Sequence, residues 1–246
     1  MEAKEKKLSG NHIKFIAILA MTVDHLTWLF FPGFHTEWYV IALHILGRLT
    51  APIMWFFIAE GCRYTRDIKK YVGRLLVFAV ISHFAYNFAF GIPFVPSGIF
   101  NQTSVMWSLM WGVVLIAVCR METVPQWAKI AAIVVGCVLS FPSDWSCIAA
   151  MCPFFLYAHR SSFKRQSMDI VLWSFVYAAV YFLFIDKLYG ALQMCTFLSI
   201  PVLSAYNGKR GTWKGMKWFF YAYYPAHLFV IGILRVLLHG DIRLVF

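Results

Sequence analysis

Apolar runs about as long as a bilayer crossing recur along the whole chain, separated by short segments that hold most of the charges. Of the 246 residues, 61% are hydrophobic and only 13% are charged. A soluble domain carries about 25% charged residues, so this chain cannot cover a surface that faces water. The sequence therefore predicts an all-α polytopic integral membrane protein, with residues 1–246 forming a single transmembrane domain.

A membrane-spanning helix needs roughly 20 mostly apolar residues, and the chain has room for about nine of them but for no sizeable soluble domain. The first apolar run, from Ile13 to Phe31, is longer than the apolar region of a signal peptide, which spans about 7–15 residues. We therefore interpret it as the first span. The predicted spans are residues 12–31, 39–61, 71–90, 104–120, 127–141, 145–159, 168–185, 190–206 and 217–239.

Lysine and arginine fall almost entirely on one side of this arrangement, as the positive-inside rule requires of cytoplasmic segments. The side that holds the N-terminus has Lys4, Lys6, Lys7, Arg63, Arg66, Lys69, Lys70, Arg120, Lys129, Arg160, Lys164, Arg165, Lys209, Arg210 and Lys214. Only Lys187 and Arg243 remain on the other side. The pattern predicts a cytoplasmic N-terminus and an outer C-terminus. The net charge of +11 follows from this topology, so we expect no nucleic-acid partner.

Several ionisable or amide side chains lie inside the predicted spans, where they are costly and usually functional. At a rise of about 1.5 Å per residue, they are predicted to share one layer from the membrane midplane outward. Adjacent residues on a helix point about 100° apart, so Asp24 is expected to meet a partner from another helix, with Arg48 as the candidate. The layer comprises Asp24, His25, His44, Arg48, His83, Asn87 and His227.

These residue types are compatible with three functions. They could transfer an acyl group, carry protons in a transporter or lipid flippase, or hold helices together in an assembly factor without enzyme activity. The odd number of spans and the lack of a visible inverted repeat weigh against the transporter. The six cysteines are scattered through apolar segments without metal-like pairing, so no metal site is expected.

Four blocks of sequence resemble one known family. The first is Leu8-Ser9-Gly10 leading to Asp24-His25, and the second runs from Gly47-Arg48 to Glu60-Gly61 with Tyr64-Thr65-Arg66. The third is Lys70-Tyr71 with Arg74-Leu75-Leu76, and the fourth is Tyr206-Asn207-Gly208-Lys209-Arg210-Gly211 followed by Tyr224-Pro225-Ala226-His227. Together these blocks resemble the TraX family over nearly the whole chain.

The TraX family is known for acetylating the N-terminal amine of conjugative pilin, and it is similar to membrane acyltransferases that O-acylate envelope polysaccharides. The resemblance implies an acetyltransferase in the bacterial inner membrane that uses acetyl-CoA from the cytoplasm. Lys14, Ala17 and His25 match a basic residue, alanine and histidine in the first span of that wider group, where arginine is commoner than lysine. His227 matches a histidine in an aromatic-rich late span.

Each candidate residue has a predicted role. His25 is the predicted general base, since the unperturbed pKa of histidine lies near working pH; Asp24 would orient a neighbour, and Arg48 would support the oxyanion or fix Asp24. His227 is the alternative base.

The phosphates of acetyl-CoA would be bound by Lys14, Arg66, Lys70, Arg74, Asn207, Lys209 or Arg210. Residues predicted to bind the acceptor are His44, His83, Asn87 and Tyr224. The acceptor (a peptide, a glycan or a small molecule) and the oligomeric state stay open.

Overall fold

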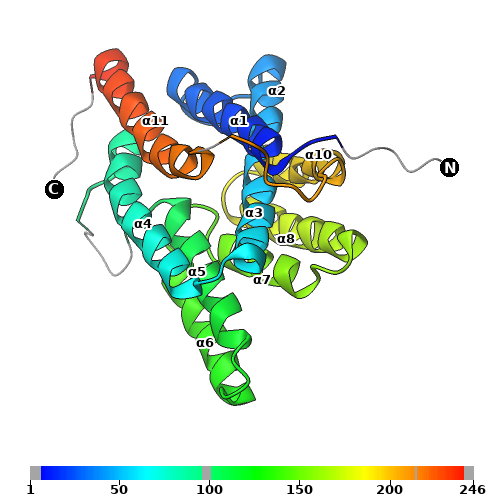
Figure 1. Cartoon of the computed structure of the whole chain (residues 1–246). Helices are drawn as coiled ribbons and strands as arrows, with labels where there is room; N and C mark the ends of the chain where they lie inside the picture. Colours follow the sequence, from blue (N-terminus) through cyan, green and yellow to red (C-terminus); the bar gives the residue numbers. More distant parts are fainter. Residues whose placement is uncertain (1–6, 96–100, 214, 241–246) are drawn as a thin grey trace. The chain divides into compact units, whose positions relative to one another are not determined.

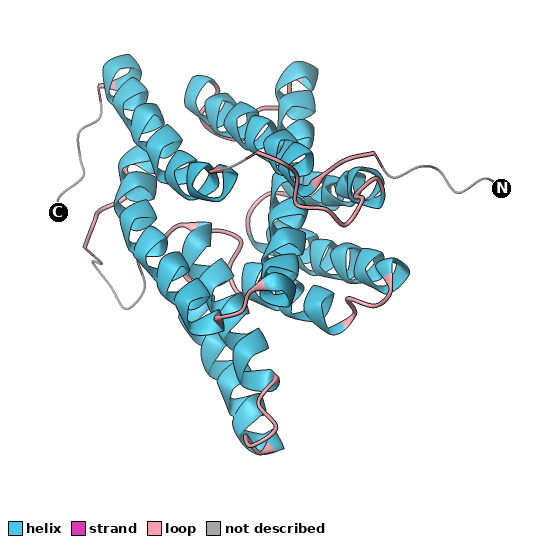
Figure 2. Cartoon of the chain, in the orientation of Figure 1, coloured by secondary structure: helices cyan, strands magenta, loops and turns pink. Residues whose placement is uncertain are grey.

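The computed structural model describes residues 7–95, 101–213 and 215–240, and all regular structure in this part of the chain is helical (Figure 2). Two isolated bridges, Leu8 with Tyr206 and Thr103 with Ser143, are its only β-type pairings. The all-α prediction is confirmed. Four of the charges used to predict topology, at Lys4, Lys6, Lys214 and Arg243, lie outside the described residues.

Figure 1 shows the helices in their order along the chain. In chain order they are α1 (Gly10–Phe30), α2 (Trp38–Gly47), α3 (Thr50–Tyr64), α4 (Ile68–Phe90), α5 (Val105–Cys119), α6 (Gln126–Ser140), α7 (Ile148–Ala158), α8 (Phe163–Phe184), α9 (Lys187–Gln193), the 3₁₀ helix η1 (Met194–Leu198), α10 (Ser199–Ser204) and α11 (Met216–His239).

Five of the predicted spans are helices long and apolar enough to cross a membrane, counting α2 and α3 together as one. These features of length and composition identify a multi-pass membrane protein. The predicted spans at 104–120, 127–141 and 145–159 correspond to the shorter apolar helices α5, α6 and α7. The predicted span at 190–206 is not one α-helix: η1 separates α9 from α10.

The chain divides into two compact units, each made of two stretches of sequence. The first comprises Met1–Phe57 with His159–Met216, and the second comprises Ile58–Ala158 with Lys217–Phe246. The prediction of a single domain stays a prediction.

In the first unit, α1 packs against α2 and α8 packs against α9. Gly190 allows the second contact, because a Cβ there would lie 2.5 Å from the backbone nitrogen of Phe182. The hydroxyl of Thr50 donates to the carbonyl of Ala17 at 3.2 Å and so ties the start of α3 to α1. The hydroxyl of Thr196 donates to that of Ser174 and joins η1 to α8.

The second predicted span is interrupted between α2 and α3, at Arg48 and Leu49. Pro52 stands four residues after Arg48, so it has no N–H to donate to the Arg48 carbonyl, and its ring crowds that group. The last turn of α2 closes with the N–H of Arg48 on the carbonyls of His44 and Ile45. Pro52 thus accounts for a helix break at the buried Arg48.

In the second unit, α5 packs against α4, α6 and α7. Helix α11 lies beside α4, where the rings of Tyr221 and Phe78 stack at 4.9 Å. Nη2 of Arg235 donates at 3.2 Å to the carbonyl of Phe88, in the last turn of α4. A cation suits that position because the carbonyl end of a helix is partially negative.

Asp67 caps the start of α4, and its contribution to stability can be tested. The carboxylate of Asp67 accepts the backbone N–H of Lys70 at 3.0 Å, and this hydrogen bond lowers the pKa of Asp67 below its ordinary value of 3.8. A lowered carboxyl pKa stabilises the fold above the unfolded pKa, and the stabilisation is lost as the pH falls through the folded one.

We therefore expect Asp67→Ala to unfold at a lower temperature than wild type at pH 7, with a smaller difference at pH 3. Thermal unfolding in detergent checks this. Asp67→Asn is the control, because it keeps a cap without a titrating charge. A difference between wild type and Asp67→Ala that does not change with pH would contradict the prediction.

Candidate functional site

The carboxylate of Asp24, on α1, is the centre of a hydrogen-bonded cluster in the first unit. Nη2 of Arg48 donates to both of its oxygens, at 2.6 and 2.7 Å. Nδ1 of His44 lies 2.9 Å from Oδ1. The interhelical partner expected for Asp24 is therefore Arg48, as predicted, with His44 as a second partner.

Every nitrogen of the Arg48 guanidinium has a partner. Besides Asp24, Nε donates to the carbonyl of His44 at 3.2 Å, and Nη1 donates to Oε1 of Gln193 at 2.9 Å. The two predicted roles of Arg48 were to support an oxyanion or to fix Asp24. Its contacts favour the second role, because Nη2 donates to both oxygens of the Asp24 carboxylate.

Gln193, the last residue of α9, is a member of the cluster that sequence reasoning missed. Its side chain is buried, and its amide oxygen brings α9 to the helix break. The available signal was an amide residue within a mostly apolar segment, where a buried polar group needs a partner.

Gly47 allows α2 to approach Asp24. A Cβ at this position would lie 2.4 Å from both Cβ and Oδ1 of Asp24. Atoms never come that close without a bond, so only glycine fits here while Asp24 keeps its place. The residue before Arg48 thus determines how closely the arginine and the carboxylate can meet.

Aromatic rings surround His44. The ring of Trp28 lies 4.6 Å away and that of Tyr189 lies 5.4 Å away, between centroids. The Tyr189 hydroxyl accepts the N–H of His35 at 3.1 Å and donates to the carbonyl of His35 at 3.2 Å. His44 is 1% exposed, and its Nε2 has no hydrogen-bond partner among the described residues. Because Nδ1 donates to Asp24, Nε2 of a neutral His44 carries a lone pair.

His25 follows Asp24 on α1 and is half-buried. It is close enough to Asp24 and Arg48 for their charges to act on its ring. The structure thus brings four of the predicted site residues together in the first unit: Asp24, His25, His44 and Arg48. Whether His25 is the base stays a prediction.

Four of the residues predicted to bind acetyl-CoA also lie in the first unit, where the N-terminal segment pairs with the 205–211 segment. The ammonium of Lys14 lies 4.8 Å from the ring centre of Phe57, and Arg210 is close enough to act on its charge. Oδ1 of Asn207 accepts the N–H of Lys209 at 2.9 Å, within a turn.

The predicted binding of phosphate by backbone N–H groups of the 207–211 segment stays a prediction. There the carbonyls of Lys209 and Arg210 accept the N–H groups of Gly10 and Asn11, at 2.8 and 3.0 Å. These carbonyls cap the first turn of α1, whose N–H groups would otherwise be unsatisfied.

The other predicted phosphate ligands lie in the second unit. Lys70 forms a 3.5 Å ion pair with Asp67 at the surface, and Arg66 is exposed beside it. Arg74 lies 5.7 Å from the Tyr71 ring and hydrogen-bonds to the side chain of Tyr221. These contacts hold α4 to its cap and to α11.

His83 and Asn87, on α4, hold the loop that follows their helix. Nε2 of His83 donates to the carbonyl of Phe94 at 3.0 Å, and Nδ1 lies 3.0 Å from the hydroxyl of Thr103. The amide nitrogen of Asn87 donates to the carbonyl of Pro93 at 2.9 Å. Both ring nitrogens of His83 are thus used inside the fold, and a role in binding the acceptor stays a prediction.

His227 and Tyr224 lie on α11, in the second unit. Nδ1 of His227 donates to the carbonyl of Tyr223 at 3.0 Å, and the two rings stack at 5.2 Å between centroids. Tyr224 is buried and hydrogen-bonds to the backbone of Val105. The predicted layer is therefore distributed over both units, and its being one layer stays a prediction.

The chain is similar to known proteins over nearly its whole length. The model of a family described as "TraX protein" matches residues 9–235. A relative from Dichelobacter nodosus, described as "Probable fimbrial assembly protein FimC, serogroup H1", is 30% identical over 234 residues, which cover 89% of this chain and 93% of the relative. No solved structure matches the chain significantly. The matched range includes the whole Asp24 cluster, and the chain belongs to the TraX family.

Proposed function

We propose that this protein is a membrane-embedded acetyltransferase that moves an acetyl group from cytoplasmic acetyl-CoA to an amine or hydroxyl at the outer half of the membrane. One observation carries the proposal most strongly: the Asp24 carboxylate is held by Arg48 and His44 inside apolar helices, beside His25. A buried ion pair with histidines at membrane depth is typical of a functional site. The activity known for the TraX family supplies the reaction class.

In this mechanism His25 is the general base. It takes a proton from the acceptor, whose nitrogen or oxygen attacks the carbonyl carbon of the thioester. The new bond forms as the carbon–sulfur bond breaks, and the protonated His25 gives its proton to the departing sulfur, so that CoA leaves as its thiol. Arg48 balances the charge of Asp24. The lone pair on Nε2 of His44 is suited to accept a hydrogen bond from the acceptor.

The relative from Dichelobacter nodosus supports a choice of acceptor. Its name places that relative in fimbrial assembly, and fimbriae are built from peptide subunits. We therefore propose a pilin-like peptide amine as the first acceptor to test, with an envelope glycan as the second.

The orientation proposed here rests on the lysine and arginine distribution, which supports a cytoplasmic N-terminus. The proposed bacterial inner-membrane location comes from the TraX family. The N-terminal end of α1 would then face the donor. The acetyl group would cross the membrane during the reaction.

The test uses purified protein in sealed liposomes, with radiolabelled acetyl-CoA on one side and a peptide or glycan acceptor on either side. Wild type is expected to acetylate the acceptor, and His25→Asn to lose about 100-fold or more of the rate, the usual contribution of a general base. His239→Asn, at an exposed position on α11, is the matched control and should keep the rate.

Two results would overturn the proposal. One is the absence of acetyl transfer and thioester hydrolysis by wild type with every acceptor, and the other is an unchanged rate in His25→Asn. Solute uptake driven by a proton gradient, without acetyl transfer, would identify the transporter instead. Acetylation only of acceptors on the donor side would refute transfer across the membrane.

A further inference from the structure

Two cysteines meet at one end of α6, in the second unit. Cys137 lies in the last turn of α6, and Cys147 is the residue directly before α7. Their thiols are in hydrogen-bond contact, and both side chains are half-buried. Sulfur atoms in contact have only a short way to move before they reach the disulfide bond length of about 2.05 Å.

Helix α5 holds the backbone beside each of these cysteines. Nε1 of Trp107, on α5, donates at 2.7 Å to the carbonyl of Leu139 in the last turn of α6. On the other side, a Cβ at Gly112 would lie 3.0 Å from the carbonyl oxygen of Ala150 in the first turn of α7. Packing this close resists displacement, so the contact between the two thiols belongs to the packed state of this unit.

The turn between the two cysteines is held in a conformation that the chain would not adopt alone. The backbone N–H and carbonyl of Thr103 both hydrogen-bond to this turn, at 3.1 and 2.8 Å. Trp145 and Ser146 have φ angles of +63° and +49°, in the left-handed region that side chains rarely adopt. Such residues persist only where the surrounding structure determines them. The fold, and not local preference, therefore determines how the chain reaches Cys147.

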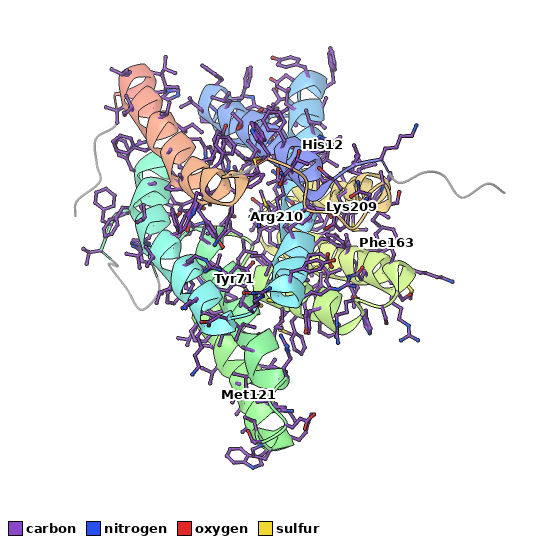
Figure 3. All side chains as sticks on the ribbon, viewed as in Figure 1. His12, Tyr71, Met121, Phe163, Lys209 and Arg210 are labelled. Atoms are coloured by element: carbon purple, nitrogen blue, oxygen red, sulfur yellow. The ribbon has the colours of Figure 1, made fainter. Side chains whose placement is uncertain are left out.

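The turn also lies at the end of α6 that is away from the basic residues. Met121, in the connection between α5 and α6, marks the basic end (Figure 3), where Arg120 and Lys129 lie. Arg160 follows the end of α7, and the residues between Lys129 and Arg160 include no lysine or arginine. In the proposed orientation the 141–147 turn thus faces away from the cytoplasm, on the side where disulfides form and persist.

We propose that Cys137 and Cys147 are an oxidation site, at which a disulfide forms on the outer side of the membrane and stabilises the joint between α6 and α7. The oxidant is the disulfide of an extracytoplasmic thiol oxidoreductase. One cysteine thiolate attacks a sulfur of that disulfide and releases the other sulfur, and the second cysteine thiolate then displaces the oxidant from the mixed disulfide. Two electrons and two protons pass to the oxidant, which leaves as a dithiol. The inference goes beyond the proposed function, since it needs no step of acetyl transfer.

The test counts the thiols that are protected by a disulfide in cells that express the full chain. Proteins are precipitated with acid, blocked with N-ethylmaleimide in denaturant, reduced, and labelled with a maleimide–polyethylene glycol that slows the chain on a gel. Wild type is expected to gain two labels after reduction, whereas Cys137→Ser and Cys147→Ser should gain none. Cys195→Ser, which changes a half-buried cysteine of the first unit, is the matched control and should gain two.

Mass spectrometry identifies the bond. Chymotrypsin cleaves after Phe141 and Trp145, which stand between the two cysteines. The cysteines therefore fall into separate peptides that only a disulfide can hold together. The linked pair is expected from wild type without reduction and should disappear after reduction.

Thermal unfolding in detergent measures the contribution to stability. Reduction should lower the unfolding temperature of wild type by about 5 °C, because a disulfide that closes a short loop restricts the unfolded chain. The double variant, Cys137→Ser with Cys147→Ser, should unfold at the same temperature with and without reductant.

Two results would overturn the oxidation site: complete blocking of both thiols by N-ethylmaleimide before reduction, and a linked peptide that joins either cysteine to a different one. Equal unfolding temperatures of oxidised and reduced wild type would refute the role in stability. None of these measurements depends on acetyl transfer, so their failure and that of the proposed function are distinguishable.

Discussion

Asp24→Asn is expected to lower the free energy of unfolding by about 3–5 kcal/mol, the usual result of removing one partner from a buried ion pair. The side chains of Asp24 and Arg48 are only 13% and 11% exposed. Asparagine keeps the volume and can still accept the Nδ1–H of His44, but it leaves the guanidinium without a counter-charge. SDS-driven unfolding in mixed micelles gives the free energy.

A double variant separates stability from chemistry. Asp24→Asn with Arg48→Met removes both charges, and replacing a buried pair by neutral groups is often close to neutral in stability. We therefore expect the double variant to recover more than half of the loss, while acetyl transfer stays as low as in Asp24→Asn. Additive losses would contradict a coupled pair. Recovery of activity together with stability would show that the cluster only holds helices together.

The Asp24–Arg48 pair could be predicted because apolar spans offer a buried carboxylate few partners. Neither residue can reach a counter-charge within its own helix, and an unpaired charge at membrane depth is too costly to persist. Estimated depth then pointed to Arg48. His44 shares a helix face with Arg48, which is consistent with its place on the same carboxylate.

Other features of the site had weaker signals in the sequence. The helix break at Arg48 follows from Pro52, although prolines are common in membrane helices and most do not indicate a site. Gln193 is neutral, so a search for ionisable groups missed it. The pairing of Leu8 with Tyr206 depends on backbone contacts between distant segments, which no local pattern encodes.

The role of His83 could not be deduced from the sequence for a different reason. A histidine inside a span indicates a functional group or a structural hydrogen-bond partner, and the choice depends on where both ring nitrogens point. Here they meet Phe94 and Thr103, in the connection between α4 and α5. Loop paths of this kind are set by tertiary packing and cannot be deduced from spacing.

The second large effect is expected from Gly47→Ala. The added methyl group would lie 2.4 Å from Cβ and Oδ1 of Asp24, and Asp24 cannot retreat without giving up its bonds to Arg48 and His44. Overpacking of this kind typically costs about 1–3 kcal/mol. A displacement of about 1 Å near a catalytic group can lower a rate about 100-fold, so acetyl transfer should fall by that order.

Gly73→Ala is the matched control for this variant. Gly73 lies within α4, and a Cβ there would meet no atom within 4 Å, so the same substitution should be neutral or slightly stabilising because alanine favours a helix. The comparison removes the general effect of exchanging glycine for alanine and leaves the collision with Asp24. Equal stability and equal activity of Gly47→Ala and Gly73→Ala would mean that α2 does not approach Asp24 this closely. A loss confined to Gly47→Ala would instead show that the position of the carboxylate, and not its charge alone, governs the site.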